Sequence, residues 1–354
     1  MWIHSKKIDR YFILFPHWIG LILLVLFPSY FLNAQQTSTL DWLVLILCID
    51  VAHVYSTLFR TYFHPEARHL NGKLLILIPL LCFFAAVLAM EISTTVFWSL
   101  LAYLAVFHFI RQQYGFVNMY QRLQKAPAWV VKTDTWFVYL FTGIPILIWH
   151  VEGPKNFVWF TEHDFLFFPH ATVAIGLKTL LAVLFLLLGI SFFVQWKNAY
   201  FNRPKNLIIL ATALNWSIGI VYLNGDLAFT MLNVIAHGIP YMTLIWIQGN
   251  KSHTNSKLLR WVFSNQGAIA ILLVCIFFGL IEEGIWDRLF WQEHATLFGF
   301  LDFMQPVESA WLKNIVIPLL ALPQITHYVI DGFIWRKRDS DARWKEPQSK
   351  AKKE

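Results

Sequence analysis

Charged residues are scarce in this sequence of 354 residues: only 14% are Asp, Glu, Lys or Arg, whereas 57% are hydrophobic. Soluble domains usually carry about 25% charged residues and about 45–50% apolar residues. So few charges cannot cover the surface of a soluble globule of this size. We therefore exclude a soluble globular protein and predict an all-α fold, a polytopic helical bundle integral to a membrane.

Cysteine is also rare, with three residues that lie far apart in apolar segments, Cys48, Cys82 and Cys275. This placement predicts packing residues and argues against a disulfide framework or a thiolate metal site. The sequence also lacks a phosphate-binding glycine loop, a CxxC pair, a G-x-S-x-G elbow and a CxxCH haem attachment. None of the activities that depend on these motifs is indicated.

Aromatic residues are abundant, with 17 Trp, 32 Phe and 12 Tyr, as is typical of membrane proteins with aromatic belts. A spanning helix needs about 20 mainly apolar residues. On this criterion we expect about ten spans, of which the third is short, and nine is the alternative count. They lie near 11–32, 40–60, 73–90, 95–115, 133–150, 172–195, 206–224, 227–248, 264–281 and 311–335.

The basic residues alternate between the two sides of the predicted membrane. If the N-terminus is cytoplasmic, 24 of the 28 Lys and Arg residues lie on the cytoplasmic side. The positive-inside rule then predicts ten spans with both termini in the cytoplasm. We expect a single transmembrane domain over residues 1–338 and a disordered, charged cytoplasmic tail over 339–354. The absence of long soluble loops favours a bacterial inner membrane.

Four histidines lie in the second, fourth, eighth and tenth predicted spans, which all run in the same direction. Each has polar neighbours three or four residues away, so that every one of these helices carries a polar stripe on one face. Ionisable groups inside a membrane usually face the interior of a bundle and indicate function. We therefore expect the four faces to meet. The histidines are His53, His108, His237 and His327.

Neutral imidazole is a common ligand of zinc, iron and copper. We therefore predict that the four histidines bind a metal, with iron (one or two ions) preferred and zinc as an alternative. Asp50 precedes His53 by three residues and Asp331 follows His327 by four. Either carboxylate would complete the coordination or orient a ring. Gln112 and Tyr241 are the further candidates for catalytic residues, which would tune the site or donate protons.

Three arginines close histidine-bearing helices at the predicted cytoplasmic edge. They are Arg60, Arg111 and Arg336. One hypothesis is a basic rim that holds the anionic head group of a lipidic substrate. The alternative is that the arginines extend to the membrane interface and set the topology.

A second group follows the second predicted span, where His64, Glu66 and His69 form an H-x4-H pair with an acidic residue. This pair loosely resembles the histidine boxes of membrane fatty-acid desaturases and hydroxylases, which implies a di-iron centre at the cytoplasmic face. The resemblance covers this pair alone, since no H-x-x-H-H box follows. We keep these residues as secondary metal candidates, with a solvated turn as the alternative.

Together these patterns favour an integral-membrane metalloenzyme, an oxidoreductase of the oxygenase, desaturase or hydroxylase kind. Its substrate would be a lipid or isoprenoid at the cytoplasmic half of the membrane, and its partner an electron-donor protein. Two alternatives use the same residues. One is an electron-transfer protein with haem b, and the other is a proton-coupled transporter in which the His/Asp pairs are relays.

Overall fold

The computed structural model describes residues 2–33, 37–156, 159–252 and 254–335. All regular elements in these ranges are helical and none is a strand, which confirms the predicted all-α fold. The elements that build or flank the spans are α1 (Lys6–Ile8), η1 (Asp9–Leu14), α2 (Phe15–Leu26), α3 (Pro28–Asn33), α4 (Thr39–Trp42), η2 (Leu43–Val51), α5 (Ala52–Arg60), α6 (Pro65–Ile92), α7 (Thr94–Arg122), α8 (Ala128–Glu152), α9 (Ala171–Lys197), α10 (Arg203–Trp216), η3 (Ser217–Tyr222), α11 (Asp226–Lys251), α12 (Lys257–Val262), α13 (Ala268–Trp286), η4 (Asp287–Trp291), η5 (Gly299–Leu301), α14 (Ala310–Leu320) and α15 (Leu322–Ile334).

Within the described ranges, nine helical segments are long and apolar enough to cross a membrane. They are α1–η1–α2, α4–η2–α5, α6, α7, α8, α9, α10–η3, α11 and α13–η4. The pair α14 and α15 meets the same criterion together, so that the count is nine or ten. Both numbers agree with the prediction, and the chain is consistent with a multi-pass membrane protein.

The tenth predicted span is not one straight helix. α14 and α15 are bent by 41° at the break between Leu320 and Leu322. Pro323 stands in the first turn of α15, where it has no N–H to bond the carbonyl group one turn earlier. Proline is a usual cause of such a kink, and the prediction of one continuous helix over 311–335 needs this correction.

Two other boundaries differ from the prediction. The third span is not short, because α6 begins at Pro65 and has 28 residues. Its first turns are polar, which hid them from a search for apolar residues. The ninth span continues through Glu282 and Glu283, which the prediction placed in the following connection. Both carboxylates therefore lie on a helix.

Contacts divide the chain into two compact units. The first unit comprises Met1–Ser38 and Ala105–Pro240, and the second comprises Thr39–Leu104 and Tyr241–Glu354. The division falls inside α7 and inside α11. The prediction of one transmembrane domain over residues 1–338 stays a prediction, and the predicted tail over 339–354 lies outside the described residues.

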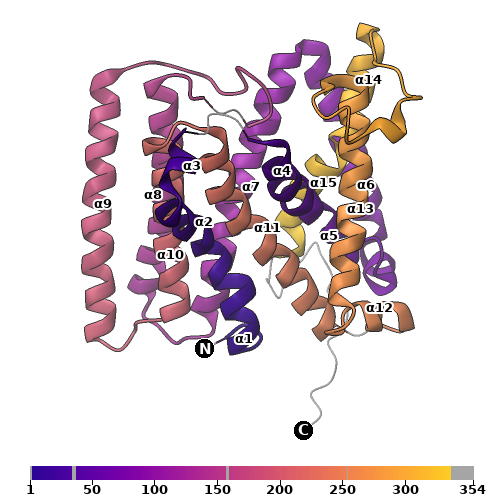
Figure 1. Cartoon of the computed structure of the whole chain (residues 1–354). Helices are drawn as coiled ribbons and strands as arrows, with labels where there is room; N and C mark the ends of the chain where they lie inside the picture. The colour runs from indigo at the N-terminus through magenta and orange to yellow at the C-terminus, as the bar shows by residue number, and fades with distance from the viewer. Residues whose placement is uncertain (1, 34–36, 157–158, 253, 336–354) are drawn as a thin grey trace. The chain divides into compact units, whose positions relative to one another are not determined.

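In the first unit, α9 packs along α8, which also contacts α10, and α10 in turn contacts α2. Figure 1 shows α9 running beside α8. Three of these helices share a buried polar network, in which Lys205 of α10 pairs with Asp134 of α8. Gln195 of α9 donates from Nε2 to Asp134 Oδ1 at 3.0 Å and accepts from Lys205 Nζ at 3.1 Å. Opposite charges buried with their hydrogen bonds satisfied fix the register of the three helices.

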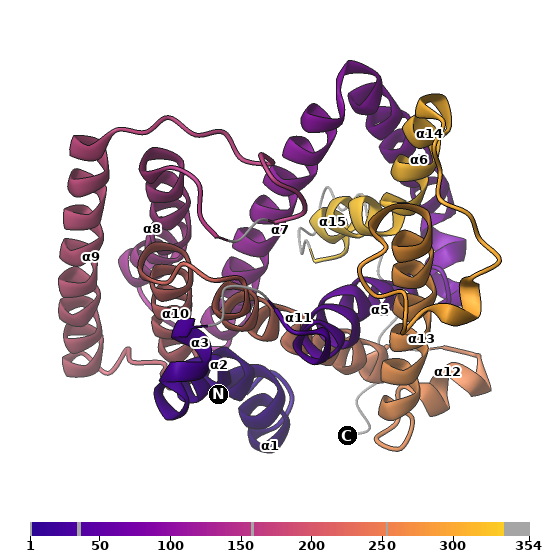
Figure 2. The same cartoon turned by 45° about the horizontal axis from the view of Figure 1, so that its top comes forward.

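In the second unit, α13 packs along η2 and α5, and α15 contacts both α5 and α6. These neighbours can be followed in Figure 2. α6 contributes Ala67, Leu75, Ile78 and Cys82 to a core that α15 completes with Ile330 and Ile334. This apolar contact holds α15 against α6 and directs the polar face of α15 toward α5.

Candidate functional site

Two of the predicted histidine ligands come together in the second unit. His53 lies on α5 and His327 on α15. Their rings are 4.9 Å apart between centroids and nearly perpendicular, at 78°. The two residues are 1% and 2% exposed. Two imidazoles at this distance and depth are close enough to share one small ion, because metal–imidazole bonds are about 2.0–2.1 Å long.

Each of these rings has a carboxylate on its own helix. Asp50 Oδ1 lies 3.5 Å from His53 Nδ1, and Asp331 Oδ1 lies 4.0 Å from His327 Nδ1. His327 and Asp331 offer ligand atoms within 4.8 Å of each other. This confirms the helical spacing read from the sequence, and buried histidine and aspartate groups of this kind could hold a metal ion.

A chain of hydrogen bonds continues from His327. Thr57 Oγ1 lies 2.7 Å from His327 Nδ1 and 2.8 Å from the hydroxyl oxygen of Tyr241. The Tyr241 hydroxyl in turn donates to Asp331 Oδ1 at 2.5 Å. The ring of Tyr241 also packs edge-on against both histidines of this unit. Tyr241 therefore contacts both histidines of this unit, and its predicted catalytic role stays a prediction, whereas Thr57 was not among the predicted site residues.

The backbone just before His53 is unusual. Residues Leu43–Val51 form a π-helical stretch, and the N–H of Ala52 reaches back five residues to the carbonyl oxygen of Leu47. π-Helical turns are rare and are frequent at functional sites. The wider turn sets the directions in which Asp50 and His53 project. Gly279 of α13 approaches this stretch, since an added Cβ would lie 3.5 Å from the oxygen of Leu47.

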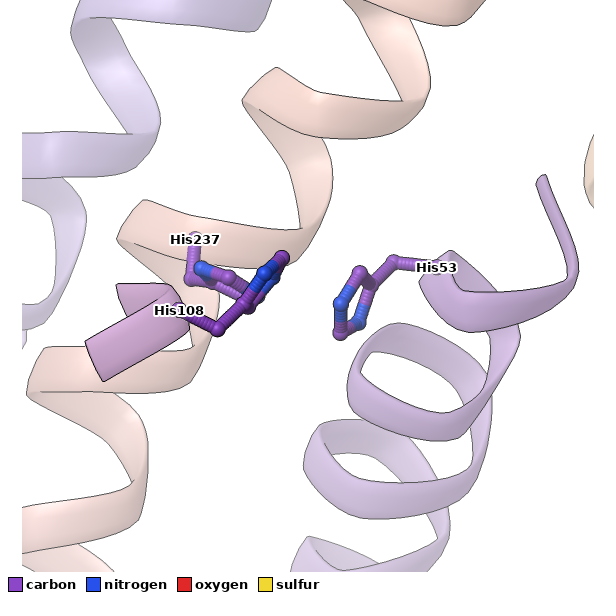
Figure 3. A group of neighbouring side chains, drawn as sticks. All are labelled: His53, His108 and His237. Carbon is purple, nitrogen blue, oxygen red and sulfur yellow. The ribbon is translucent and has the colours of Figure 1, made fainter. Parts of the chain in front are cut away.

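The other two predicted ligands come together in the first unit. His108 of α7 and His237 of α11 have ring centroids 5.0 Å apart and are nearly perpendicular, at 79°. Their ligand atoms lie within 4.8 Å of each other, and both rings are buried. The His237 ring also stacks on the ring of Phe109 at 3.7 Å. Figure 3 draws these two side chains on α7 and α11, with His53 on α5.

The prediction that all four histidine faces meet joins residues from both units, and it stays a prediction. Within each unit, the structure shows one pair of buried histidines.

Gln112 lies on α7 in the first unit, where both polar atoms of its amide are buried without a hydrogen-bond partner among the described residues. The neighbouring Gln113 is engaged instead, because it accepts from Thr212 at 3.0 Å and donates to the carbonyl oxygen of Ala236. A catalytic role for Gln112 stays a prediction.

The three arginines differ in their surroundings. Arg60 is buried, donates to the carbonyl oxygen of Ile334 at 2.5 Å and stacks over the ring of Trp335 at 4.0 Å. Arg111 is exposed and donates to the Tyr139 hydroxyl, and α7 continues beyond it to Arg122 rather than ending nearby. Arg336 lies outside the described residues. Arg60 therefore lies beside the histidine cluster of its unit and not on an open rim.

The secondary metal candidates lie at the start of α6. His64 caps this helix, and its Nδ1 accepts from the N–H of Ala67 while Nε2 lies 3.0 Å from Ser252 Oγ. Glu66 accepts hydrogen bonds from the N–H of Asn255 and from Thr254. His69 is exposed. Both ring nitrogens of His64 thus contact protein atoms, and its group connects α6 to the segment after α11.

Sequence reasoning missed two features of these units. Thr57 belongs to the polar stripe of its helix, but its two partners are 184 and 270 residues away in the sequence. The buried pair of Asp134 and Lys205 was not predicted, since Asp134 lies at the start of the predicted span 133–150 and Lys205 was counted only as a cytoplasmic basic residue. A lysine near a helix start is ordinary in a sequence, and no local pattern distinguishes a buried one.

Comparisons with protein-family models, with curated proteins and with solved structures found no match.

Proposed function

We propose that this protein is an integral-membrane metalloenzyme, a histidine-ligated oxidoreductase that acts on a lipid or isoprenoid substrate. The observation that carries the proposal is the pair of buried histidines in the second unit, His53 and His327. Each has an oxygen of its own helix near Nδ1, which is the usual arrangement around metal-bound histidines. The two histidines would hold the metal, and Asp50 and Asp331 would either complete its coordination or orient the rings.

Iron is the metal that this donor set favours for such chemistry. Two histidines with one carboxylate leave coordination positions open, as in non-haem iron oxygenases. In the balanced reaction, dioxygen and a C–H bond of the lipid give a hydroxyl group and water. Two electrons and two protons must be supplied, which implies an electron-donor protein as partner. The surrounding residues bind the apolar chain, exclude water and hold protons near the site.

The membrane and its sidedness are also part of the proposal. The distribution of Lys and Arg supports cytoplasmic termini, and the compact loops support a bacterial inner membrane. The carboxylates and histidines of the second unit then lie in the cytoplasmic half of the membrane, within reach of a soluble electron donor.

Metal content and the visible spectrum test the proposal directly. We expect protein purified in detergent without chelators to contain one or two iron ions per chain. Replacing His53 or His327 by Ala should remove the metal of their unit and the activity, while the fold is kept. The His17→Ala variant is the matched control, because His17 is another buried helix histidine, bonded to the carbonyl oxygen of Ile13. Full metal content in both the His53→Ala and the His327→Ala variants would refute the site.

The same experiment addresses the other predicted ligands. If His108 and His237 belong to one centre with His53 and His327, each of the four alanine variants should lose all of the metal. A loss of only half from each would indicate two separate sites. His69→Ala should retain all of the metal unless the secondary candidates bind it.

A Soret band would favour the haem alternative, for which the distance of 4.9 Å between the ring centroids of His53 and His327 is short. Two axial imidazoles place their coordinating nitrogens about 4 Å apart, and the ring centroids lie farther away still.

A second function is supported by the hydrogen-bonded chain through Thr57 and Tyr241. Continuous chains of His, Asp and hydroxyl groups inside a membrane are the usual material of proton relays. A metal-free preparation would favour a proton-coupled transporter. In liposomes with a trapped pH indicator, Asp331→Asn should then abolish proton movement.

A further inference from the structure

A pocket of about 400 Å³ lies where α8 ends and α9 begins, within the first unit. The N–H of His170 donates to the carbonyl oxygen of Val151 at 2.8 Å, which lays the segment before α9 along the last turn of α8. Glu152, His170 and Lys178 line the pocket. Charged side chains therefore surround a hollow at the end of a spanning helix, at the start of α9 in the upper left of Figure 1.

Two lysines share the single carboxylate of Glu152. Lys155 Nζ lies 3.2 Å from Glu152 Oε2, and Lys178 Nζ pairs with Oε1. Because one carboxylate compensates one positive charge, the group keeps one positive charge uncompensated. The Lys155 side chain is 11% exposed, whereas that of Lys178, in the wall of the pocket, is 40% exposed. The excess positive charge is therefore accessible from the pocket.

His170 adds a hydrogen-bond donor to the same wall. Its Nδ1 accepts from the N–H of Val173 at 3.4 Å, as the N-cap of α9. A backbone N–H can only donate, so this contact makes Nδ1 the acceptor, and the proton of the neutral ring is on Nε2. The N-terminus of a helix also carries a partial positive charge. Both features agree with the charge of Lys178 in favouring a negatively charged ligand.

The apolar part of the wall continues along an exposed face of α9. Ala174 and Ile175 line the pocket, and Ala182 and Leu186 follow Ile175 at spacings of seven and eleven residues, on the same face of the helix. Ile175 is 67% exposed and Leu186 is 70% exposed. The helix rises about 16 Å between these two residues, which is about half of the hydrocarbon thickness of a bilayer. An acyl chain of one leaflet matches this length.

We propose that the pocket binds the head group of an anionic phospholipid, with Lys178 in contact with the phosphate and an acyl chain along Ile175 and Leu186. The phosphodiester of phosphatidylglycerol carries one negative charge, which matches the one uncompensated lysine. In the proposed topology, Lys155 and Lys178 are two of only four Lys and Arg residues on the non-cytoplasmic side. Basic residues are rare on that side of membrane proteins, and a lipid phosphate gives this pair a local role.

Lipid binding is measured by native mass spectrometry of the protein purified in detergent. Dioleoyl-phosphatidylglycerol is compared with dioleoyl-phosphatidylcholine, which has the same acyl chains and no net charge. We expect tighter binding of phosphatidylglycerol, and a rise in its Kd of roughly 10-fold in Lys178→Gln, because a hydrogen bond between charged groups is lost. Equal Kd values for the two lipids in the wild type, or an unchanged Kd in Lys178→Gln, would overturn the proposal.

The matched control is Lys197→Gln. Lys197 is an exposed lysine at the other end of the same helix, so this variant removes the same charge and leaves the pocket intact. The Kd for phosphatidylglycerol should stay as in the wild type. A rise as large as that of Lys178→Gln would show attraction by net charge alone, and this would overturn the site.

Glu152→Gln separates binding from a structural role of the ion pair. Both Glu152→Gln and Lys178→Gln break the pair of Glu152 with Lys178, so a purely structural effect would weaken lipid binding in both. Under the proposal, Glu152→Gln removes the competing carboxylate and should lower the Kd for phosphatidylglycerol, opposite to Lys178→Gln. Weaker binding in both variants would refute the role of Lys178 as a ligand of the phosphate.

Inorganic phosphate tests whether the ligand is a lipid or a free anion. An excess of inorganic phosphate should leave phosphatidylglycerol bound, because it has no acyl chain to contact α9. Displacement of the lipid would show a site for free phosphate and refute the lipid assignment. These measurements need neither metal nor activity, so their outcome is independent of the proposed function.

Discussion

Thr57 shows how one residue obtains its role from partners that are distant in the sequence. Its place on the polar stripe of α5, four residues after His53, is set by helical spacing. Its hydroxyl group nevertheless lies within hydrogen-bonding distance of His327 of α15 and Tyr241 of α11. Any helix face can carry a threonine whose hydroxyl bonds its own backbone. Only the approach of α15 and α11 makes this one part of a site.

The buried pair of Asp134 and Lys205 leads to a prediction about stability. Asp134→Asn removes the charge that compensates Lys205, which is 1% exposed. Breaking a buried ion pair from one side typically costs about 3–5 kcal/mol. We expect a loss of this size in the free energy of unfolding, measured by denaturant titration in detergent.

The control for Asp134→Asn is Asp302→Asn. Asp302 pairs with Arg288 at 2.7 Å, but its side chain is 68% exposed, and such pairs contribute about 0–1 kcal/mol. The double variant Asp134→Leu with Lys205→Met should recover much of the lost stability, because no buried charge remains uncompensated. Equal effects of Asp134→Asn and Asp302→Asn would contradict this account.

At the scale of elements, apolar stretches placed the spans well, whereas the ends and bends of helices were less predictable. α6 starts eight residues before the predicted boundary, and α13 continues past it. Composition marks only the part of a helix that suits the membrane core, whereas the backbone hydrogen bonds continue into polar residues. The π-helical stretch η2 has no signal in the sequence. A π-helical turn differs from an α-helical one only in which carbonyl oxygen accepts the hydrogen bond from each backbone N–H.

Two glycines on helices provide a comparison of packing. A Cβ added at Gly249 of α11 would lie 2.1 Å from the ring of Phe263, whereas nothing lies within 4 Å of one added at Gly189 of α9. Phe263 is buried, so its ring has little space to move. We expect Gly249→Ala to destabilise the protein by roughly 1–3 kcal/mol through overpacking. Gly189→Ala should be neutral or stabilise by up to about 1 kcal/mol, because alanine is the better helix former.

Thermal unfolding in detergent measures both glycine variants. If Gly249→Ala is as stable as Gly189→Ala, then the ring of Phe263 does not pack on Gly249 of α11 as closely as the structure places it.

At the scale of the whole molecule, the proposed topology can be tested by labelling. With the three native cysteines replaced by alanine, a cysteine at Glu162 should react with a membrane-impermeant maleimide in intact cells. A cysteine at Ser349 should react only after the cells are opened. This follows from an even number of spans with the basic residues inside. Labelling of both positions in intact cells would refute cytoplasmic termini.

The sequence by itself determined the class of the molecule, the approximate positions of the spans and which of these helices carry the four histidines. These properties follow from local composition and from helical periodicity, which require no knowledge of neighbouring helices. The pairing of His53 with His327 and of His108 with His237, the burial of Arg60 and the chain through Thr57 were decided by tertiary structure. Each joins residues more than a hundred positions apart, and the packing of α15 on α5 and α6 brings Thr57 and His327 within hydrogen-bonding distance.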